Sequence, residues 1–363
     1  LLRAGHSLVP NLPGLYVGAG QGGGLFGMDV SGGADLDGDG VADFVVGAPL
    51  VDVPDGFGNT VFDNGSVFAI SGATGAIIWT YAHPSGLYAN NGHAVDVGPD
   101  WTGDGVAEII VGVKNLGTAF GENGAVLALN GATGQYIYFP SGTVFYYPNL
   151  SLSAHLGSSV AAIGDLDGDQ HADFLAGAPD HDLPPDAANP SGFADSGQVH
   201  AVSGATGATL WTSPAAVLTP SSNYQTNGRF GWSLAAMSDV GQSGLPIAEL
   251  NPIPDGKPDV AVGWPRRDTI HGSQAGAVVG ISGADGRQMW FYDGSPIGLN
   301  SNANLGMEVA AIGDVNFDGK SDIAAAVPNF TNGSAHAAVC LISGADGVHI
   351  WFRDLGCNSV GQY

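Results

Sequence analysis

The chain repeats one pattern five times, and this repetition constrains its fold more than any other feature. Each copy holds an acidic segment followed by an apolar run, and then a second apolar run that ends in a glycine-rich turn. The acidic segments begin at residues 35, 100, 165, 239 and 314, and the second motifs begin at residues 65, 124, 197, 276 and 337. Such a chain consists of similar units that bury their apolar faces by stacking on one another.

Each copy reads as a set of short β-strands, because its apolar runs alternate with polar residues and are bounded by turn residues. In the first copy we expect strands at about residues 25–30, 43–47, 66–71 and 76–81. The Gly-Ala-Thr-Gly segment between the last two is expected to form a hairpin turn, because glycine readily adopts a positive φ. The sequence therefore predicts an all-β fold, a β-propeller of five four-stranded blades.

The predicted propeller occupies residues 24–363 as a single domain, after a short N-terminal arm of residues 1–23. The expected blades cover about residues 24–82, 90–140, 154–213, 228–292 and 303–353.

The charge balance limits the partners that the chain can have. It carries 34 acidic residues against 9 Lys and Arg, for a formal net charge of -25. Nucleic acids and anionic membranes are bound through basic patches, and a membrane-spanning helix needs about 18 consecutive apolar residues. We therefore expect no nucleic-acid partner and no membrane insertion, whereas cations fit the composition.

The repeated segments resemble the FG-GAP repeat of integrin α-subunit propellers and of many secreted bacterial proteins. The resemblance rests on an FG or LG pair such as Phe26-Gly27, an acidic DxDxDGxxD segment, and an apolar strand that ends in Gly-Ala-Pro. It covers about residues 24–353. Integrin propellers have seven blades and this chain has five copies, so the ring size stays open. The resemblance implies calcium in the acidic segments and a secreted or cell-surface location.

The spacing of the acidic residues supports calcium independently. Alternating side chains in a tight loop converge on one point, and Ca²⁺ accepts six to eight oxygen ligands. We expect about four sites, with side-chain ligands at the first, third, fifth and ninth positions of each loop and a carbonyl at the seventh. The predicted ligands are Asp35, Asp37, Asp39, Val41 and Asp43; Asp100, Thr102, Asp104, Val106 and Glu108; Asp165, Asp167, Asp169, His171 and Asp173; and Asp314, Asn316, Asp318, Lys320 and Asp322.

The fourth copy is interrupted by an insertion at residues 241–252. It keeps Asp239, Asp255 and Asp259, and a weaker fifth site there depends on Glu249 or Asn251 folding back. The two cysteines, Cys340 and Cys357, could form one disulfide or stay as free thiols, and the sequence leaves both open.

A motif that recurs in every copy belongs to the scaffold, so we expect no catalytic site in these loops and no enzyme. Two enzyme alternatives remain, a polysaccharide-active protein and a quinoprotein dehydrogenase. Residues 69–79 resemble the repeat of the latter family, but Ser or Asn replaces its Asp. The tryptophans of the second motif are instead expected to wedge between blades: Trp79, Trp211, Trp290 and Trp351.

The long, non-repeating segments are expected on the face opposite the acidic loops, because alternate loops of an antiparallel blade lie on opposite faces. A protein or glycan ligand is expected there, and the candidate contacts are Tyr88, Tyr146, Tyr147, Trp264, Arg266 and Arg267. The sequence thus predicts a non-catalytic extracellular protein of adhesion, recognition or surface assembly. The main alternative is a self-assembling filament or surface-layer subunit joined through residues 1–23.

Overall fold

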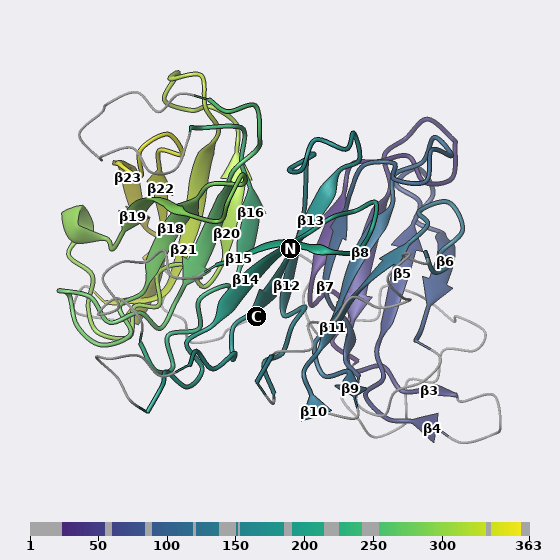
Figure 1. Ribbon diagram of the computed structural model, residues 1–363, viewed down its shortest axis with the longest axis horizontal. Coiled ribbons are helices and arrows are strands. Elements are labelled where there is room, and N and C mark those ends of the chain that lie inside the picture. The colour runs from purple at the N-terminus through teal and green to yellow at the C-terminus, as the bar shows by residue number, and fades with distance from the viewer. Residues whose placement is uncertain are drawn as a thin grey trace. The chain divides into compact units, whose positions relative to one another are not determined.

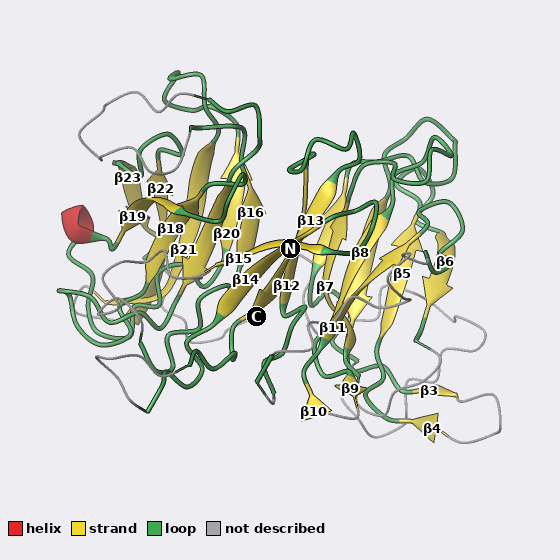
Figure 2. Ribbon diagram, viewed as in Figure 1, coloured by secondary structure: helices red, strands yellow, loops and turns green. Residues whose placement is uncertain are grey.

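The described part of the chain is almost entirely β-strand and turn. The computed structural model describes residues 24–54, 60–83, 89–118, 121–137, 150–151, 153–184, 191–213, 225–241, 254–331 and 335–356. Within these segments the one helix is the 3₁₀ helix η2 (Ser295–Ile297) (Figure 2). The chain forms two compact units, unit 1 (Leu1–Ala162 with Ser203–Ala208) and unit 2 (Ile163–Val202 with Thr209–Tyr363).

Unit 1 contains the sheets of the first two copies (Figure 1). Sheet 1 has the antiparallel order β1-β2-β5-β6, with bounds Val30–Gly32, Phe44–Ala48, Ser66–Ile70 and Ile77–Tyr81. Sheet 2 has the order β7-β8-β11, with bounds Asn91–Val97, Ile109–Val113 and Ala125–Leu129. Two-residue strands pair within loops: β3 (Val53–Pro54) with β4 (Thr60–Val61), and β9 (Gly117–Thr118) with β10 (Gly121–Glu122).

Unit 2 contains strands of the last three copies. Sheet 3 includes β13, β14 and β15, with bounds Asp173–Ala178, Gln198–Val202 and Thr209–Ser213. The remaining strand of this copy, β12 (Ser159–Ile163), begins in unit 1. Sheet 4 is β16-β17-β18-β19, with bounds Leu234–Ala236, Val260–Trp264, Ala277–Ile281 and Gln288–Tyr292. Sheet 5 is β20-β21-β22-β23, with bounds Val309–Ile312, Asp322–Thr331, Ala335–Ile342 and His349–Asp354.

The prediction of an all-β fold is confirmed, and four of the five sheets have the expected four antiparallel strands, whereas sheet 2 has three within the described residues. The expected first strand, residues 25–30, is wrong, because β1 begins only at Val30. Leu25 and Gly27 have positive φ, and the Met28 N–H donates to the Leu25 carbonyl at 2.9 Å, so this segment is a turn. The arm, residues 1–23, lies outside the described residues. A single domain with five blades stays a prediction.

Neighbouring sheets bury their faces against each other, as the repeat predicts. In unit 1, Val45 and Val67 of sheet 1 belong to one buried cluster with Ile109, Val111 and Leu127 of sheet 2. In unit 2 an equivalent cluster joins sheets 4 and 5. Each buried aliphatic side chain stabilises the fold by about 1.5–3 kcal/mol relative to exposure. Stacking therefore supplies the apolar burial that a single sheet lacks.

Two motif glycines meet where sheets stack. A Cβ at Gly47, on the central strand β2, would lie 2.0 Å from the carbonyl oxygen of Gly92, which in copy two stands at the glycine of the FG pair. The same contact recurs between Gly112 and Gly157 in unit 1, and between Gly263 and Gly306 in unit 2. Both glycines of the FG-GAP pattern are therefore needed for close backbone approach.

Candidate metal centres

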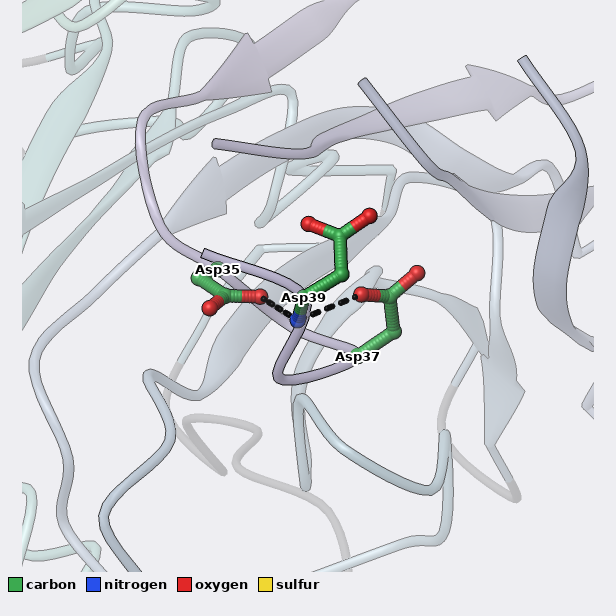
Figure 3. Close-up of side chains that lie close together, drawn as sticks. All are labelled: Asp35, Asp37 and Asp39. Atoms are coloured by element: carbon green, nitrogen blue, oxygen red, sulfur yellow. Dashed lines mark hydrogen bonds between the residues drawn. The ribbon is translucent and has the colours of Figure 1, made fainter. Parts of the chain in front are cut away.

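Acidic loop 1 (residues 35–43) joins β1 to β2 and is folded around its own carboxylates. Asp35 accepts hydrogen bonds from the N–H groups of Gly38 at 2.8 Å, Asp39 at 3.2 Å and Gly40 at 2.8 Å. Asp37 also accepts from the Asp39 N–H, at 3.1 Å (Figure 3). The sequence folds this way because Gly38 and Gly40 take positive φ, which turns the backbone back toward Asp35.

Asp43, at the ninth position, has a different task from the exposed carboxylates. It is buried, and its Oδ2 accepts from the N–H groups of Leu36 at 2.6 Å and Asp37 at 3.2 Å. Its Oδ1 accepts from the N–H of Gly72 at 2.9 Å, in the hairpin turn of the same sheet. Asp43 therefore fixes the loop to the sheet and positions the other acidic side chains.

Three acidic loops bring three carboxylates together. In each set, one oxygen of every residue lies within 4.8 Å of the others: Asp35, Asp37 and Asp39; Asp100, Asp104 and Glu108; Asp165, Asp167 and Asp173. Carboxylates are the oxygen donors that Ca²⁺ prefers, so these residues fit the cation that the resemblance implies. Part of each predicted set therefore converges in loops 1, 2 and 3 (residues 35–43, 100–108 and 165–173), whereas Asp43 of loop 1 and Asp169 of loop 3 are not in these groups.

Loop 2 contains a polar partner that the sequence reasoning missed. The Asn130 amide donates to Asp104 at 2.5 Å and lowers the pKa of that carboxyl group. Thr102 donates its hydroxyl to Glu108 at 2.8 Å, and burial raises the pKa of Glu108. Asn130 stands where the other copies have serine before Gly-Ala, and this single difference was the available signal.

Loop 5 (residues 314–322) repeats the backbone pattern with fewer charges. Asp314 accepts from the N–H groups of Asp318 at 3.1 Å and Gly319 at 2.8 Å. The Asn316 amide nitrogen donates to an Asp318 carboxylate oxygen at 2.8 Å. Asn316 therefore offers a cation only its amide oxygen, and it already occupies one oxygen of Asp318. Asp322 is buried and accepts from the Val315 N–H at 2.9 Å, as Asp43 does in loop 1. Calcium binding at loop 5 stays a prediction.

The interrupted fourth loop keeps the same frame despite its insertion. Asp239 accepts from the Gly256 N–H at 2.6 Å, which matches the bond from Gly40 to Asp35. Asp259 is buried and accepts from the N–H groups of Val240 and Gly283 at 2.7 and 3.0 Å. Burial raises the pKa of Asp259 to about 7. Glu249 and Asn251 lie outside the described residues.

The seventh position of each loop donates its N–H to the fifth. Val41 donates to Asp39 at 2.8 Å, and Lys320 donates to Asp318 at 2.9 Å. The pairs Val106 with Asp104 and His171 with Asp169 repeat this bond, at 2.9 and 2.8 Å. The use of the carbonyl groups of these residues as ligands stays a prediction.

The residues expected on the ligand face separate into three groups. Trp264 is only 1% exposed, with its ring packed edge-on against Phe230 at 5.3 Å, so its expected place on the surface is wrong. The Arg267 guanidinium lies 4.7 Å from the Trp264 ring, and burial lowers its pKa. Arg266 is half-buried. Tyr88, Tyr146 and Tyr147 lie outside the described residues.

The structure describes one of the two cysteines. Cys340 is a buried thiol on β22, and burial raises its pKa to about 12. Cys357 lies outside the described residues.

The family comparison agrees with the acidic loops and the glycine contacts. The model of the FG-GAP repeat matches residues 26–68 and 306–339, which include loops 1 and 5. Two of the chain's five copies carry the FG-GAP repeat. No curated protein sequence matches the chain. None of the helices in the described segments is long and apolar enough to cross a membrane.

Two solved structures show a distant likeness. Sqt1 from Saccharomyces cerevisiae is 13% identical with a TM-score of 0.43, and the match covers 85% of this chain. Quinohemoprotein alcohol dehydrogenase from Comamonas testosteroni is 18% identical with a TM-score of 0.43, and the match covers 86% of this chain. The chain spans 58% and 42% of the lengths of these two proteins.

Proposed function

We propose that the chain is a calcium-stabilised FG-GAP propeller that acts outside the cell as a non-catalytic scaffold for adhesion, recognition or surface assembly. The observation that supports this most directly is the convergence of three carboxylates in each of loops 1, 2 and 3. Carboxylates so close together repel one another unless a cation neutralises them. A divalent ion would remove that repulsion and fix the loop.

The acidic residues divide the work of such a site. In loop 1, Asp35, Asp37 and Asp39 are exposed or half-buried and would supply oxygens to the ion. Asp43 is buried and holds the loop to the hairpin turn through Gly72. A buried ninth-position carboxylate that accepts from backbone N–H groups recurs in loops 4 and 5, whereas the buried Glu108 and Asp173 of loops 2 and 3 belong to the converging groups. Because an acidic loop recurs in every copy, we assign the loops a structural task. The scaffold would bind its protein or glycan ligand at a surface other than the acidic loops.

Calcium binding is tested by thermal unfolding of the full chain at increasing free Ca²⁺. At a concentration 100 times the Kd, each occupied site adds about 2.7 kcal/mol to the free energy of unfolding. The triple variant Asp35→Asn, Asp100→Asn and Asp165→Asn should lose most of this gain. Asp346→Asn, in the hairpin turn of sheet 5, is the control for each of the three single substitutions, because it removes one charge while its amide oxygen can still accept from the Val348 N–H. This control should keep the wild-type response.

Terbium, which takes calcium sites and emits when excited through a nearby indole, reads loop 2 separately. Trp101 lies inside loop 2 and donates its backbone N–H to Glu108. Trp101→Phe should reduce sensitised terbium emission, whereas Trp264→Phe, at the end of β17 farther from the acidic segment, should reduce it less. Emission that is absent, or unchanged by calcium competition, would contradict an occupied site. The non-catalytic part of the proposal expects no quinone absorbance and no polysaccharide cleavage by the purified protein.

A further inference from the structure

Acidic loop 5 carries an aromatic side chain at a position where loops 1, 2 and 3 have glycine. Phe317 stands at the fourth position of the loop, which is Gly38, Gly103 and Gly168 in the other three. All four residues have positive φ, 65° for Phe317 and 81°, 76° and 86° for the glycines. A bulky residue is strained in this conformation because its Cβ crowds the following carbonyl oxygen. The fold of the loop therefore favours glycine here, and Phe317 costs stability.

The Phe317 side chain gains no burial in return for this strain, because it is 91% exposed. The glycines at the same position of loops 1, 2 and 3 are exposed as well, and no atom lies within 4 Å of a Cβ built at any of them. A side chain at this position is thus exposed in every one of these loops. The exposure of Phe317 is a property of the loop position, and it does not depend on what stands next to sheet 5.

A second exposed apolar residue belongs to the same end of sheet 5. Val348, in the hairpin turn, is 58% exposed. Ser343 links this turn to loop 5, because its hydroxyl donates to Asp318 at 3.4 Å and its backbone N–H donates to the Val348 carbonyl at 2.8 Å. We name Phe317 and Val348, which flank this link, the loop 5 patch. The residues at the turn position of Val348 are exposed in the other four copies: Ala76, Gln135, Ala208 and Arg287.

Exposed carboxylates border the loop 5 patch and keep their negative charge. They belong to Asp314, Asp318 and Asp346. Each donor to them among the described residues is neutral, namely a backbone N–H, the Asn316 amide or the Ser343 hydroxyl. The ammonium group of Lys320, the base within loop 5, donates instead to the Asp239 carbonyl at 2.6 Å. The patch therefore combines apolar surface with negative charge that no described ion pair neutralises.

Loop 5 also differs from loops 1, 2 and 3 in how its carboxylates are arranged. The converging groups of three carboxylates found among the described residues belong to those three loops and not to loop 5. The carboxylates of Asp314 and Asp318 are thus less committed to a common ion. They are correspondingly more available to a positive group that reaches the loop from outside.

We propose that the loop 5 patch binds a basic side chain, arginine above all, on a segment of a partner protein. A guanidinium group stacks on an aromatic face while carboxylates accept its N–H groups, and the ring of Phe317 with Asp314 and Asp318 supplies both. Val348 supplies apolar contact for the aliphatic stem. A residue that strains its loop and stays exposed is then explained by the contact it makes with a partner. The same carboxylates would repel an anionic membrane.

This contact goes beyond the calcium-stabilised scaffold and needs no ion in loop 5. The probe is a capped synthetic peptide, Gly-Gly-Arg-Leu-Arg-Gly-Gly, titrated into the isotope-labelled full chain with and without calcium. Amide NMR signals of Phe317, Gly319 and Val348 should shift first. Phe317→Gly should weaken binding at least about fivefold through loss of the cation–π contact. This variant restores the residue that the left-handed position favours, so misfolding does not account for the loss.

Two further variants support the assignment. Val348→Ser removes the second apolar side chain and should also weaken binding. Ile270→Ser is the matched control, because it removes an 84% exposed apolar side chain from the loop between β17 and β18, at the end of sheet 4 opposite its acidic loop. This control should bind the peptide as the wild type does.

The peptide chemistry and a vesicle assay decide between the possible partners. Citrulline in place of each arginine keeps the shape without the charge and should abolish binding. Binding of the citrulline peptide, equal affinity for Phe317→Gly, or shifts confined to loops 1, 2 and 3 would overturn the proposal. Sedimentation with anionic vesicles in calcium that requires Phe317 would also overturn it, because the patch would then contact a membrane. The calcium response of Tm, measured without peptide, shows a failure of the calcium sites separately.

Discussion

Asn91 is a buried amide at a position where the other copies have a large apolar residue. It opens β7 and pairs with Gly65, and the same bridge is made by Leu156, Phe230 and Leu305 in the later copies. Those three side chains are buried, and Asn91 itself is 0% exposed. Neither its amide nitrogen nor its amide oxygen has a hydrogen-bond partner among the described residues. The chain thus bears an unpaired polar group at an apolar inter-sheet position.

We predict that Asn91→Leu stabilises the protein. Leu has nearly the shape of Asn, so the change removes an unsatisfied amide without opening a cavity or crowding the site. An unpaired buried amide costs about 1–3 kcal/mol in protein mutational data, so the gain should be about 2 kcal/mol. With an entropy of unfolding near 2.1 cal/mol/K per residue over 363 residues, this gain corresponds to a rise in Tm of about 3 °C. The rise is larger if unit 1 unfolds separately.

Urea unfolding and scanning calorimetry measure the change. The reverse substitution Leu156→Asn, at the matching position of the third copy, should destabilise the protein by at least the same amount. Asn91→Ala is the cavity control and should not raise Tm. A neutral or destabilising Asn91→Leu would refute the reasoning, because it would mean that the amide is satisfied at that site and is part of what orders the inter-sheet contact.

Three further predictions follow from single positions. Gln170 has φ 72 where loops 1 and 2 have Gly40 and Gly105, so Gln170→Gly should relieve left-handed strain and raise the free energy of unfolding by about 0.5–1 kcal/mol in urea titrations; a loss of stability would contradict this. Gly47→Ala would place a Cβ 2.0 Å from the Gly92 carbonyl and should cost about 3 kcal/mol, whereas Gly313→Ala meets open space and should cost far less by the same measurement. Burial lowers the pKa of His200 to about 3, below its unfolded value near 6.5, so stability is fully present above pH 6.5 and falls as pH drops toward 3. His200→Gln should flatten that fall in unfolding measured from pH 7 to 4, and an unchanged fall would contradict this.

The repeated sheets were predictable because the apolar runs that form their strands recur in every copy of the sequence pattern. The strands around Phe44–Ala48 and Ser66–Ile70 match their apolar runs closely, since each run is bounded by turn residues. The structure at the start of each copy was harder to predict from the sequence. Leu25 lies in an apolar segment, yet its positive φ comes from the turn that brings Gly27 against the neighbouring strand. A pattern of polarity does not encode that backbone geometry.

The acidic loops were predictable as groups, but not in the task of each carboxylate. Spacing identified Asp35, Asp37 and Asp39, whereas the burial of Asp43 and its bond to Gly72 depend on how the loop meets the sheet. The insertion in copy four separates Asp239 from Asp259 in sequence only, because both are tied to backbone N–H groups of the same loop. The sequence analysis wrongly placed Trp264 on the surface. The two arginines close to it in sequence suggest an exposed segment, and its packing in the interior is visible only in the structure.

The contact between Gly47 and Gly92 has an evolutionary consequence. The same two glycine positions meet at three junctions between neighbouring copies, so these copies present similar backbone surfaces to one another. Duplication of a gene segment that encodes one copy would therefore carry both glycines of this backbone contact with it. The number of copies in such chains can therefore change, whereas the two glycines at each junction between copies cannot be replaced without a steric clash.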